Sequence, residues 1–324
     1  MNIGILGAGN IARKMAATVN AMEDTVLYAV ASRSAEKAKN FADEFGALKF
    51  YGSYEELAAD GNIDLIYVAT PHSHHYEHAL LCLNAGRNVL CEKAFTANAK
   101  QAEELICIAE RKGLYLGEAI WTRYLPMRFR LDEIIASGVI GEITSLTANL
   151  GYSLADVERM KKPELAGGAL LDLGVYPINF ALMAFGSDIA EITSSCVKNE
   201  YGVDTHNTVV FHYRDGKTAI IHSNMNAETD KRGMIYGSNG RIEFENVNNC
   251  EGIVVTLKDG TVTRYDTPAQ ITGFEYQVES AIAAIRQGRT QSSEMPHSEI
   301  LRVMRIMDDL RAAWGIVYPF EENA

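Results

Sequence analysis

The sequence predicts an α/β protein in which a doubly wound parallel sheet is followed by an α+β domain built on an open, largely antiparallel sheet. Three observations support this fold class. Residues 1–120 alternate short apolar runs with longer amphipathic ones, which is the pattern of parallel strands joined by crossover helices. Uninterrupted apolar strands such as residues 65–69 are typical of a parallel sheet that is covered on both faces. Beyond about residue 121 short strands dominate, and 324 residues correspond to about two domains.

The elements of the first domain alternate regularly along the chain. Strands are predicted at residues 3–6, 26–31, 63–69, 88–91 and 115–119. Helices are predicted between them at residues 11–22, 35–45, 76–85 and 98–112. We therefore expect a first domain of residues 1–120.

The second domain, residues 121–324, mixes helices with many short strands. Helices are predicted at residues 127–137, 167–185, 274–287 and 297–314. Strands are predicted at residues 142–149, 189–197, 208–213, 218–224, 232–236, 241–245, 253–257 and 262–265. Asp215-Gly216, Asn239-Gly240 and Asp259-Gly260 each separate two such strands and supply the positive φ angles of tight hairpins. The sheet should therefore be largely antiparallel, and the last helix is a candidate for packing back on the first domain.

Composition and charge argue against several classes of partner. The chain has 30 basic and 42 acidic residues, a net charge of −12, and no Lys/Arg-rich run, so we expect no nucleic-acid partner. Five widely spaced cysteines without a C-x-x-C pair indicate neither a disulfide framework nor a zinc site and favour the cytoplasm. No apolar run approaches the ~18 residues that span a bilayer, and the N-terminus lacks a basic leader, so we expect no membrane partner and no export.

A glycine-rich turn lies between the first strand and the first helix. Gly7, Gly9, Asn10, Ile11 and Ala12 belong to a G-x-G-x-x-A segment. The first glycine permits a tight turn, the second lets the backbone approach a pyrophosphate, and Ala12 allows close helix packing. Because the helix N-terminus supplies N–H donors, we interpret this segment as the phosphate loop of a dinucleotide-binding Rossmann domain.

The end of the second strand indicates which dinucleotide is preferred. An NAD site usually has a carboxylate there, whereas this strand ends Ala31-Ser32-Arg33-Ser34. Arg33 can hold a 2′-phosphate with its guanidinium, Ser32 can donate a hydroxyl, and Lys37 adds charge one helical turn later. We predict NADP as the cofactor, with NAD as the alternative. A solvated arginine at a helix start, without a role in cofactor binding, is the alternative interpretation of Arg33.

Four histidines follow the strand that ends at residue 69. They lie where a doubly wound sheet places its ligand crevice, with no cysteine and only Glu77 as a carboxylate, so we predict no metal. We expect Thr70, His72 and His75 to line the cofactor cleft and His74 and His78 to lie in solvent.

Two further segments carry candidate reactive groups. Glu92-Lys93 ends a strand, where Lys93 could act as a point charge beside a reacting oxygen and Glu92 could orient it; a surface ion pair is the alternative. Asp172 and Tyr176 are four residues apart and so share a helix face. Taken alone, Tyr176 would be read as a core aromatic.

Together these motifs resemble the glucose-fructose oxidoreductase/inositol dehydrogenase/rhizopine-catabolism (Gfo/Idh/MocA) family. The resemblance covers essentially the whole chain and is closest to the branch of dimeric dihydrodiol dehydrogenases and NADP-dependent xylose dehydrogenases. The matching segments are Gly7 to Ala12, Thr70-Pro71-x-x-x-His75, Glu92-Lys93, Trp121-x-Arg123 and Gly168 to Tyr176. The family's usual Glu-Lys-Pro is Glu92-Lys93-Ala94 here, which leaves the position of Lys93 less constrained.

The resemblance implies an enzyme that transfers a hydride between NADP and a secondary alcohol of a sugar, cyclitol or cyclic diol. It implies Tyr176 or Lys93 as the proton-transferring group, Asp172 as a substrate- or cofactor-side carboxylate, and Trp121 and Arg123 near cofactor or substrate. It also implies a homodimer formed through the C-terminal sheet. A catalytically silent NADP-binding regulator of the same fold is the main alternative, and a sheet domain that only binds a small molecule is a third.

Overall fold

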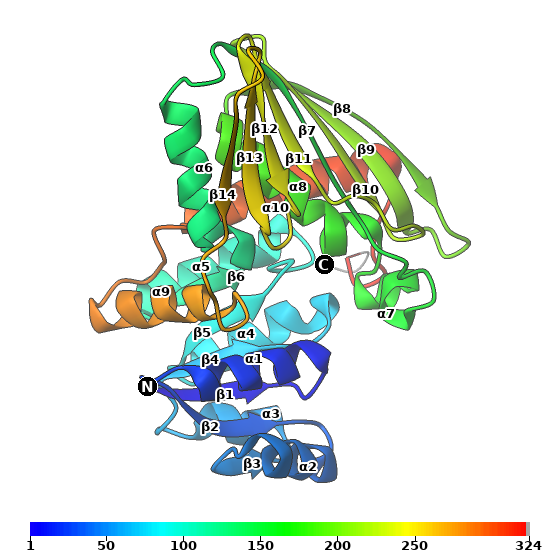
Figure 1. The fold of residues 1–324 in the computed structure, drawn as a ribbon. Helices are drawn as coiled ribbons and strands as arrows, with labels where there is room; N and C mark the ends of the chain where they lie inside the picture. Colours follow the sequence, from blue (N-terminus) through cyan, green and yellow to red (C-terminus); the bar gives the residue numbers. More distant parts are fainter. Residues whose placement is uncertain (322–324) are drawn as a thin grey trace. The chain divides into compact units, whose positions relative to one another are not determined.

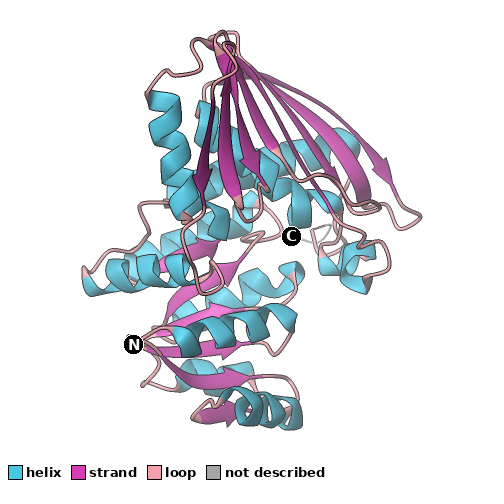
Figure 2. Cartoon of the chain, in the orientation of Figure 1, coloured by secondary structure: helices cyan, strands magenta, loops and turns pink. Residues whose placement is uncertain are grey.

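The computed structural model describes residues 1–321, which form two compact units (Figures 1 and 2). Unit 1 contains residues 1–121 and 270–305, and unit 2 contains residues 122–269 and the chain from residue 306 onward. The segment 270–305, which follows the second sheet in sequence, thus belongs to the same unit as the first sheet.

Unit 1 is built on a six-stranded parallel sheet with the strand order β3-β2-β1-β4-β5-β6. Its strands are β1 (Asn2–Leu6), β2 (Val26–Ala31), β3 (Lys49–Tyr51), β4 (Leu65–Val68), β5 (Asn88–Glu92) and β6 (Leu116–Ala119). Its helices are α1 (Asn10–Ala21), α2 (Ala35–Phe45), α3 (Tyr54–Ala59), α4 (His75–Asn84), α5 (Ala99–Lys112) and α9 (Glu275–Arg286). The predicted doubly wound sheet is confirmed, and its order reverses between β1 and β4, where such sheets bind ligands at the carboxyl ends of the strands.

Two short elements of unit 1, β3 and α3, were not predicted from the sequence. β3 has only three residues and a mostly exposed burial pattern, so it lacks the apolar run by which a strand is recognised. α3 has six residues, too few to establish a helical period. Ser53 accepts a hydrogen bond from the backbone N–H of Glu56, so a side-chain cap marks its start.

Unit 2 is built on an eight-stranded sheet with the order β14-β13-β12-β11-β7-β10-β9-β8, in which only the β7–β10 pair is parallel. Figure 1 shows these strands as one fan. They are β7 (Ile143–Gly151), β8 (Ile189–Lys198), β9 (Asp204–Tyr213), β10 (Thr218–Asn224), β11 (Gly233–Gly237), β12 (Gly240–Glu245), β13 (Gly252–Leu257) and β14 (Val262–Asp266). The predicted open, mostly antiparallel sheet is confirmed.

One face of this sheet is covered by helices. Unit 2 contains α6 (Pro126–Ala136), α7 (Glu158–Lys161), a π-helical turn (Leu170–Gly174) and α8 (Val175–Phe185), and α10 (His297–Trp314) runs from unit 1 into unit 2. The π-helical turn and α8 pack on β7, β9 and β10. Side chains along β9 alternate between buried and half-buried, which is the period of a strand with one covered face.

The predicted helix over residues 167–185 differs from the structure at its start. The helix begins at Leu170 with one π-helical turn, and a short 3₁₀ turn at Pro163–Leu165 precedes it. We expected no apolar segment long enough to span a membrane, yet Pro163–Phe185 meets criteria of length and hydropathy. Because 83% of its apolar window is buried within the protein, it also has the character of a core helix.

Candidate functional site

The phosphate loop follows β1 and leads into α1. Gly7 has φ +112°, and a Cβ there would lie 2.8 Å from the carbonyl oxygen of Ala69, so only glycine suits this turn. Gly9 is exposed, and a Cβ there would have no atom of the described residues within 4 Å. Gly9 is also the N-cap of α1, and among residues 1–321 no side chain caps this helix. The first-turn amides, Asn10 and Ile11 among them, therefore border open space, as pyrophosphate binding requires, while Ala12 is fully buried against the sheet.

The residues after β2 form a cationic segment without a carboxylate at the strand end. Ser32 is buried, whereas Arg33 and Lys37 are exposed. Ser34 accepts a hydrogen bond from the backbone N–H of Lys37 at 3.2 Å and so caps α2. A groove of about 210 Å³ extends from Ala8 of the phosphate loop past Ser34 to Lys37. Ser34 and Lys37 offer a hydroxyl and a cation to a phosphate group beside the loop, while Glu36 and Glu44 also line the groove and Glu44 pairs with Arg13.

A second groove, of about 660 Å³, is lined in part by Arg33. Its lining includes Tyr54, His74, Glu77 and His78 from α3, the 3₁₀ turn at His72–His74 and α4. Burial raises the pKa of Tyr54, and the hydrogen bond that Arg33 donates to its hydroxyl opposes that rise. Arg33 therefore borders the second groove, whereas Ser34 and Lys37 border the first. Tyr54 is a site residue that was not recognised from the sequence, because α3 was not predicted.

The histidines differ in their surroundings. His75 is fully buried, with Nδ1 2.8 Å from the carbonyl oxygen of Ala94 and Nε2 2.8 Å from that of Thr70. Burial lowers its pKa to about 4, so the ring is neutral at pH 7 and donates to one of these oxygens. His75 thus packs between the carbonyl of Thr70 after β4 and the carbonyl of Ala94 after β5. His72 is also buried.

The expectation that His78 lies in solvent is wrong. His78 is 8% exposed, its Nδ1 is 2.9 Å from the hydroxyl of Thr70, and its ring packs edge-on against Tyr54 with centroids 4.6 Å apart. Burial lowers its pKa to about 4. Its position on the inner side of α4 could not be read from a single polar segment, because every third or fourth residue of a helix shares a face. His74 is half-buried and stacks on His78 at 5.6 Å.

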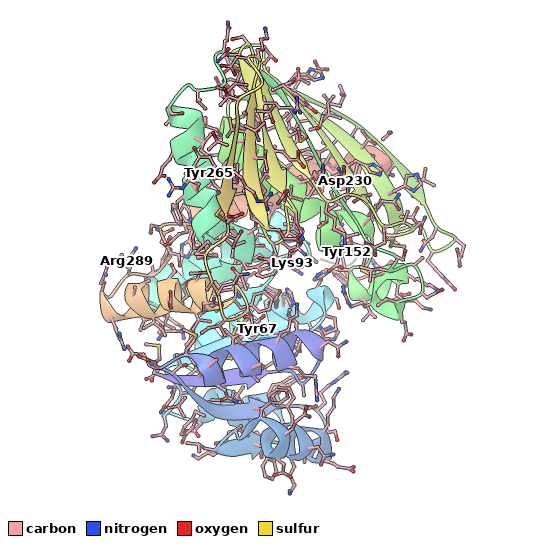
Figure 3. All side chains as sticks on the ribbon, in the orientation of Figure 1. Tyr67, Lys93, Tyr152, Asp230, Tyr265 and Arg289 are labelled. Carbon is pink, nitrogen blue, oxygen red and sulfur yellow. The ribbon has the colours of Figure 1, made fainter. Side chains whose placement is uncertain are left out.

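Glu92 and Lys93 end β5, beside the loop that follows β4. Glu92 is 6% exposed, accepts a hydrogen bond from the hydroxyl of Tyr67, and accepts another from the backbone N–H of Lys93 at 3.3 Å. Lys93 is half-buried, and the Lys93–Ala94 peptide bond is cis (Lys93 and Tyr67 are labelled in Figure 3). Glu92 is therefore a buried carboxylate that holds the backbone from which Lys93 extends. Tyr67 is a second residue that sequence reasoning missed, since it lies within an apolar strand.

Trp121 and Arg123 have different partners. Trp121 is 6% exposed and packs against Phe274 with ring centroids 4.4 Å apart in unit 1. Arg123 is 4% exposed and belongs to unit 2, where its Nε donates to the side-chain oxygen of Asn179 on α8 at 2.6 Å.

Asp172 and Tyr176 lie on the helix that begins with the π-helical turn. Both are buried, at 4% and 6% exposure. Asp172 lies within the π-helical turn and Tyr176 in the first turn of α8, so about one turn separates them. Asp172 accepts two hydrogen bonds from the guanidinium of Arg159, at 3.0 and 3.1 Å. π-helical turns are rare and frequently occur at functional sites.

The start of this helix is held by a buried carboxylate. Asp204, at the beginning of β9, accepts hydrogen bonds from the backbone N–H of Leu170 at 2.9 Å and from Asn207 Nδ2 at 2.7 Å. Burial raises the pKa of Asp204 to about 6. Neither Asp204 nor Arg159 was predicted as a site residue. The partner of Asp204 is distant in sequence, and Arg159 lies in a segment without the period of a helix or strand. Among the described residues, no group of three or more His, Cys, Asp or Glu side chains is arranged to hold a metal ion.

Comparisons with known proteins agree with this architecture. Residues 1–119 match the oxidoreductase family with an NAD-binding Rossmann fold, and residues 130–243 match the Gfo/Idh/MocA C-terminal domain. A trans-1,2-dihydrobenzene-1,2-diol dehydrogenase of Danio rerio is 33% identical over 97% of each chain. A D-xylose 1-dehydrogenase (NADP⁺) of Hypocrea jecorina is 35% identical over 90% of this chain and 84% of its own.

Solved structures are similar over the same length. The 3-ketoreductase KijD10 of Actinomadura kijaniata, in complex with NADP and TDP-benzene, has a TM-score of 0.88 and 26% identity, covering 96% of this chain and 97% of its own. A levoglucosan dehydrogenase with NADH and L-sorbose, at 18% identity and TM-score 0.86 over 97% of both chains, shares the fold. The chain belongs to the Gfo/Idh/MocA family of oxidoreductases and contains an NAD(P)-binding Rossmann domain.

Proposed function

We propose that this member of the Gfo/Idh/MocA family catalyses reversible, NADP-dependent oxidation of a secondary alcohol in a sugar, cyclitol or cyclic diol. The observation that carries the proposal is the arrangement along one edge of the parallel sheet. The phosphate loop follows β1, Thr70 to His75 follow β4, and Lys93 follows β5, and in the sheet these strands are consecutive neighbours. The names of the relatives, which act on diols, xylose and a keto group, support the same class of substrate.

The residues after β2 support NADP rather than NAD. Arg33 and Lys37 offer exposed cations where an NAD site usually has a carboxylate, and the groove from the phosphate loop reaches Lys37. A guanidinium can hold a 2′-phosphate by two charge-assisted hydrogen bonds. The xylose dehydrogenase relative is named for NADP⁺, and the KijD10 structure contains NADP.

This preference is tested by the affinity of Arg33→Ala for the two cofactors. We expect the Kd for NADP to rise about 10- to 100-fold, because charge-assisted hydrogen bonds are lost, while the Kd for NAD stays within about threefold. Lys39→Ala is the matched control, since Lys39 lies on α2, the helix that follows Arg33, is exposed and pairs with Asp43 at 2.6 Å. Equal or better kinetics with NAD, together with unchanged NADP affinity in Arg33→Ala, would contradict the preference.

The proposed chemistry uses three side chains. NADP, when bound, supplies the hydride acceptor at the nicotinamide. Lys93 Nζ polarises the substrate oxygen by its positive charge, and Tyr176 Oη takes the hydroxyl proton as the alcohol is oxidised and returns it in the reverse direction. A phenol has a pKa of about 10, and a nearby cation favours its ionised form. Asp172 accepts hydrogen bonds from substrate hydroxyls. Lys93 Nζ is the alternative group for the proton transfer.

A screen of aldoses, inositols and cyclic diols, followed by nicotinamide absorbance, tests the function. We expect turnover with at least one of these substrates and loss of at least about 100-fold in kcat for Tyr176→Phe and for Lys93→Met, with NADP affinity retained. The pH profiles of the two variants then show whether Tyr176 or Lys93 transfers the proton. The variant that lacks the transferring group should lose the limb of the profile that this group's titration produces. Full turnover in both variants would refute the mechanism, and tight NADP binding without turnover on any substrate would favour the regulator.

We propose further that the protein is a cytoplasmic homodimer that pairs through the outer face of its eight-stranded sheet. This face carries exposed Ile220 and Tyr236, at 45% and 37% exposure, on β10 and β11 near the centre of the sheet. The five unpaired cysteines agree with a reducing compartment. Light scattering after gel filtration should give twice the chain mass for the wild type and a monomer for Ile220→Asp; a monomeric wild type would exclude the dimer.

A further inference from the structure

The short helix α7 is attached to the start of the helix that carries Asp172. The backbone N–H of Gly168 donates to the carbonyl of Met160 at 2.9 Å, and that of Gly167 donates to the carbonyl of Lys162 at 3.0 Å. A Cβ at Gly167 would lie 2.7 to 2.8 Å from the carbonyl oxygens of Arg159, Met160 and Lys162. The two glycines therefore allow the backbone of α7 to contact the backbone just before the π-helical turn.

This contact brings Arg159 to Asp172. Nη1 of Arg159 is 3.0 Å from Oδ1 of Asp172 and Nη2 is 3.1 Å from Oδ2, so the guanidinium binds both carboxylate oxygens in parallel. The Asp172 side chain is 6% exposed, whereas that of Arg159 is 43% exposed. The pair therefore joins a buried carboxylate to a guanidinium that solvent reaches. Bidentate geometry fixes the plane of the carboxylate, which a lysine ammonium cannot do.

The pairing of Arg159 with Asp172 affects the electrostatic surroundings of Tyr176. Asp172 precedes Tyr176 by one helical turn, and both side chains are buried. An unpaired carboxylate at this position would either take up a proton or oppose the ionisation of a neighbouring phenol, because like charges disfavour each other in a poorly solvated region. A guanidinium bound to both oxygens prevents Asp172 from taking up a proton, and it weakens the repulsion between the Asp172 carboxylate and an ionised Tyr176.

We propose that Arg159 is a positioning residue for the reaction, holding Asp172 ionised and in one orientation beside Tyr176 and thereby supporting turnover. The proposal rests on the proposed function, since it assigns Arg159 a role in that same reaction. Arg159 acts through Asp172.

The test compares Arg159→Gln with Arg159→Lys. The glutamine removes both the positive charge and the two parallel N–H donors of the guanidinium, whereas the lysine keeps only the positive charge. We expect kcat to fall about 10- to 100-fold in Arg159→Gln and to be partly restored in Arg159→Lys, with KM changed less than about threefold. The acid limb of the pH profile should move about one unit higher in Arg159→Gln, because a carboxylate without its cation protonates more readily. Lys161→Gln is the matched control: Lys161 lies on the same helix and pairs with exposed Asp156 at 3.4 Å.

Two results would overturn the proposal. In the first, Arg159→Gln has the same kcat as Lys161→Gln and the same acid limb of the pH profile. The other is a loss of kcat that follows only the loss of folded protein, with an unmoved acid limb and no rescue by Arg159→Lys, because that pattern indicates a purely structural contact.

A second measurement separates this proposal from the proposed function. The titration of the Asp172 carboxyl carbon by NMR, in wild type and in Arg159→Gln, needs no turnover. If no sugar or diol is turned over by the wild type, the proposed function fails and the catalytic role of Arg159 fails with it, whatever the titration shows. If the wild type turns substrate over but the Asp172 titration is the same in both proteins, Arg159 does not hold Asp172 and only this proposal is overturned.

Discussion

Replacement of Asp204 by asparagine should change how the stability of unit 2 depends on pH. Asp204 is 2% exposed and accepts hydrogen bonds from Leu170 N and Asn207 Nδ2, so it fixes the first turn of the helix that carries Asp172. Burial raises its pKa from 3.8 to about 6, although the two hydrogen bonds and nearby Arg311 act in the opposite direction. Asparagine keeps an oxygen acceptor for these donors but does not titrate.

The magnitude follows from the displaced pKa. A difference of about two units corresponds to about 3 kcal/mol at 1.36 kcal/mol per unit. The folded-state pKa lies above the unfolded one, so between about pH 4 and pH 6 the folded protein holds a proton that the unfolded chain has lost. The free energy of unfolding therefore falls as pH rises through this window. The asparagine variant lacks this loss, so its stability relative to wild type should rise by about 3 kcal/mol from pH 4 to pH 7.

Urea unfolding between pH 4 and pH 7.5 measures this difference. The chain has two tryptophans, and in a Trp121→Phe background Trp314 reports on unit 2. Asp188→Asn is the control, because Asp188 lies in an exposed ion pair with Arg214, with side chains 78% and 68% exposed, and should add little pH dependence. A stability difference between Asp204→Asn and wild type that stays constant within 1 kcal/mol over this range, or that changes with the opposite sign, would refute the reasoning.

Three further substitutions test contacts that position the site. Tyr67→Phe removes the hydroxyl that donates to buried Glu92 and should destabilise unit 1 by about 1–3 kcal/mol in urea unfolding; an unchanged midpoint would show that Glu92 does not need this donor. Gly167→Ala should lower the free energy of unfolding by about 1–3 kcal/mol, because its Cβ would lie 2.7 Å from a carbonyl oxygen. Gly61→Ala is the control and should lower it by less than about 1 kcal/mol, because the atom nearest to its Cβ would be 3.9 Å away. Equal losses of stability would argue against close backbone approach as the cause. The buried carboxylate of Glu275 accepts hydrogen bonds from the backbone N–H groups of Ile271, Thr272 and Gly273 at 2.7 to 3.0 Å, and Glu275→Gln removes its charge and one acceptor oxygen. This substitution should lower the unfolding free energy by about 1.5–3 kcal/mol, so a thermal midpoint within about 1 °C of wild type would show that these hydrogen bonds do not stabilise the loop.

Local signals in the sequence were sufficient for most of the fold. Strand–helix alternation predicted five of the six strands in unit 1, and hairpin dipeptides located turns of the antiparallel sheet, because both patterns depend on residues close together in the chain. Elements of three to six residues, β3 and α3, were missed because they are shorter than the period that identifies them. The segment 270–305 could not be assigned to unit 1 for a different reason: which sheet a helix joins depends on long-range packing.

The candidate site divides in the same way. The glycine loop, Arg33, Lys93, Asp172 and Tyr176 could be named from the sequence because a motif or a helical spacing marks each of them. The sequence could not show that Glu92 binds Tyr67, that His78 is buried, that Asp204 caps the π-helical turn, or that Arg159 pairs with Asp172. These are contacts between residues 8 to 34 positions apart. By itself, therefore, the sequence determined the candidate reactive groups and the cofactor domain, whereas only tertiary packing decided which of those groups are buried and paired, because burial and pairing are properties of neighbours in space.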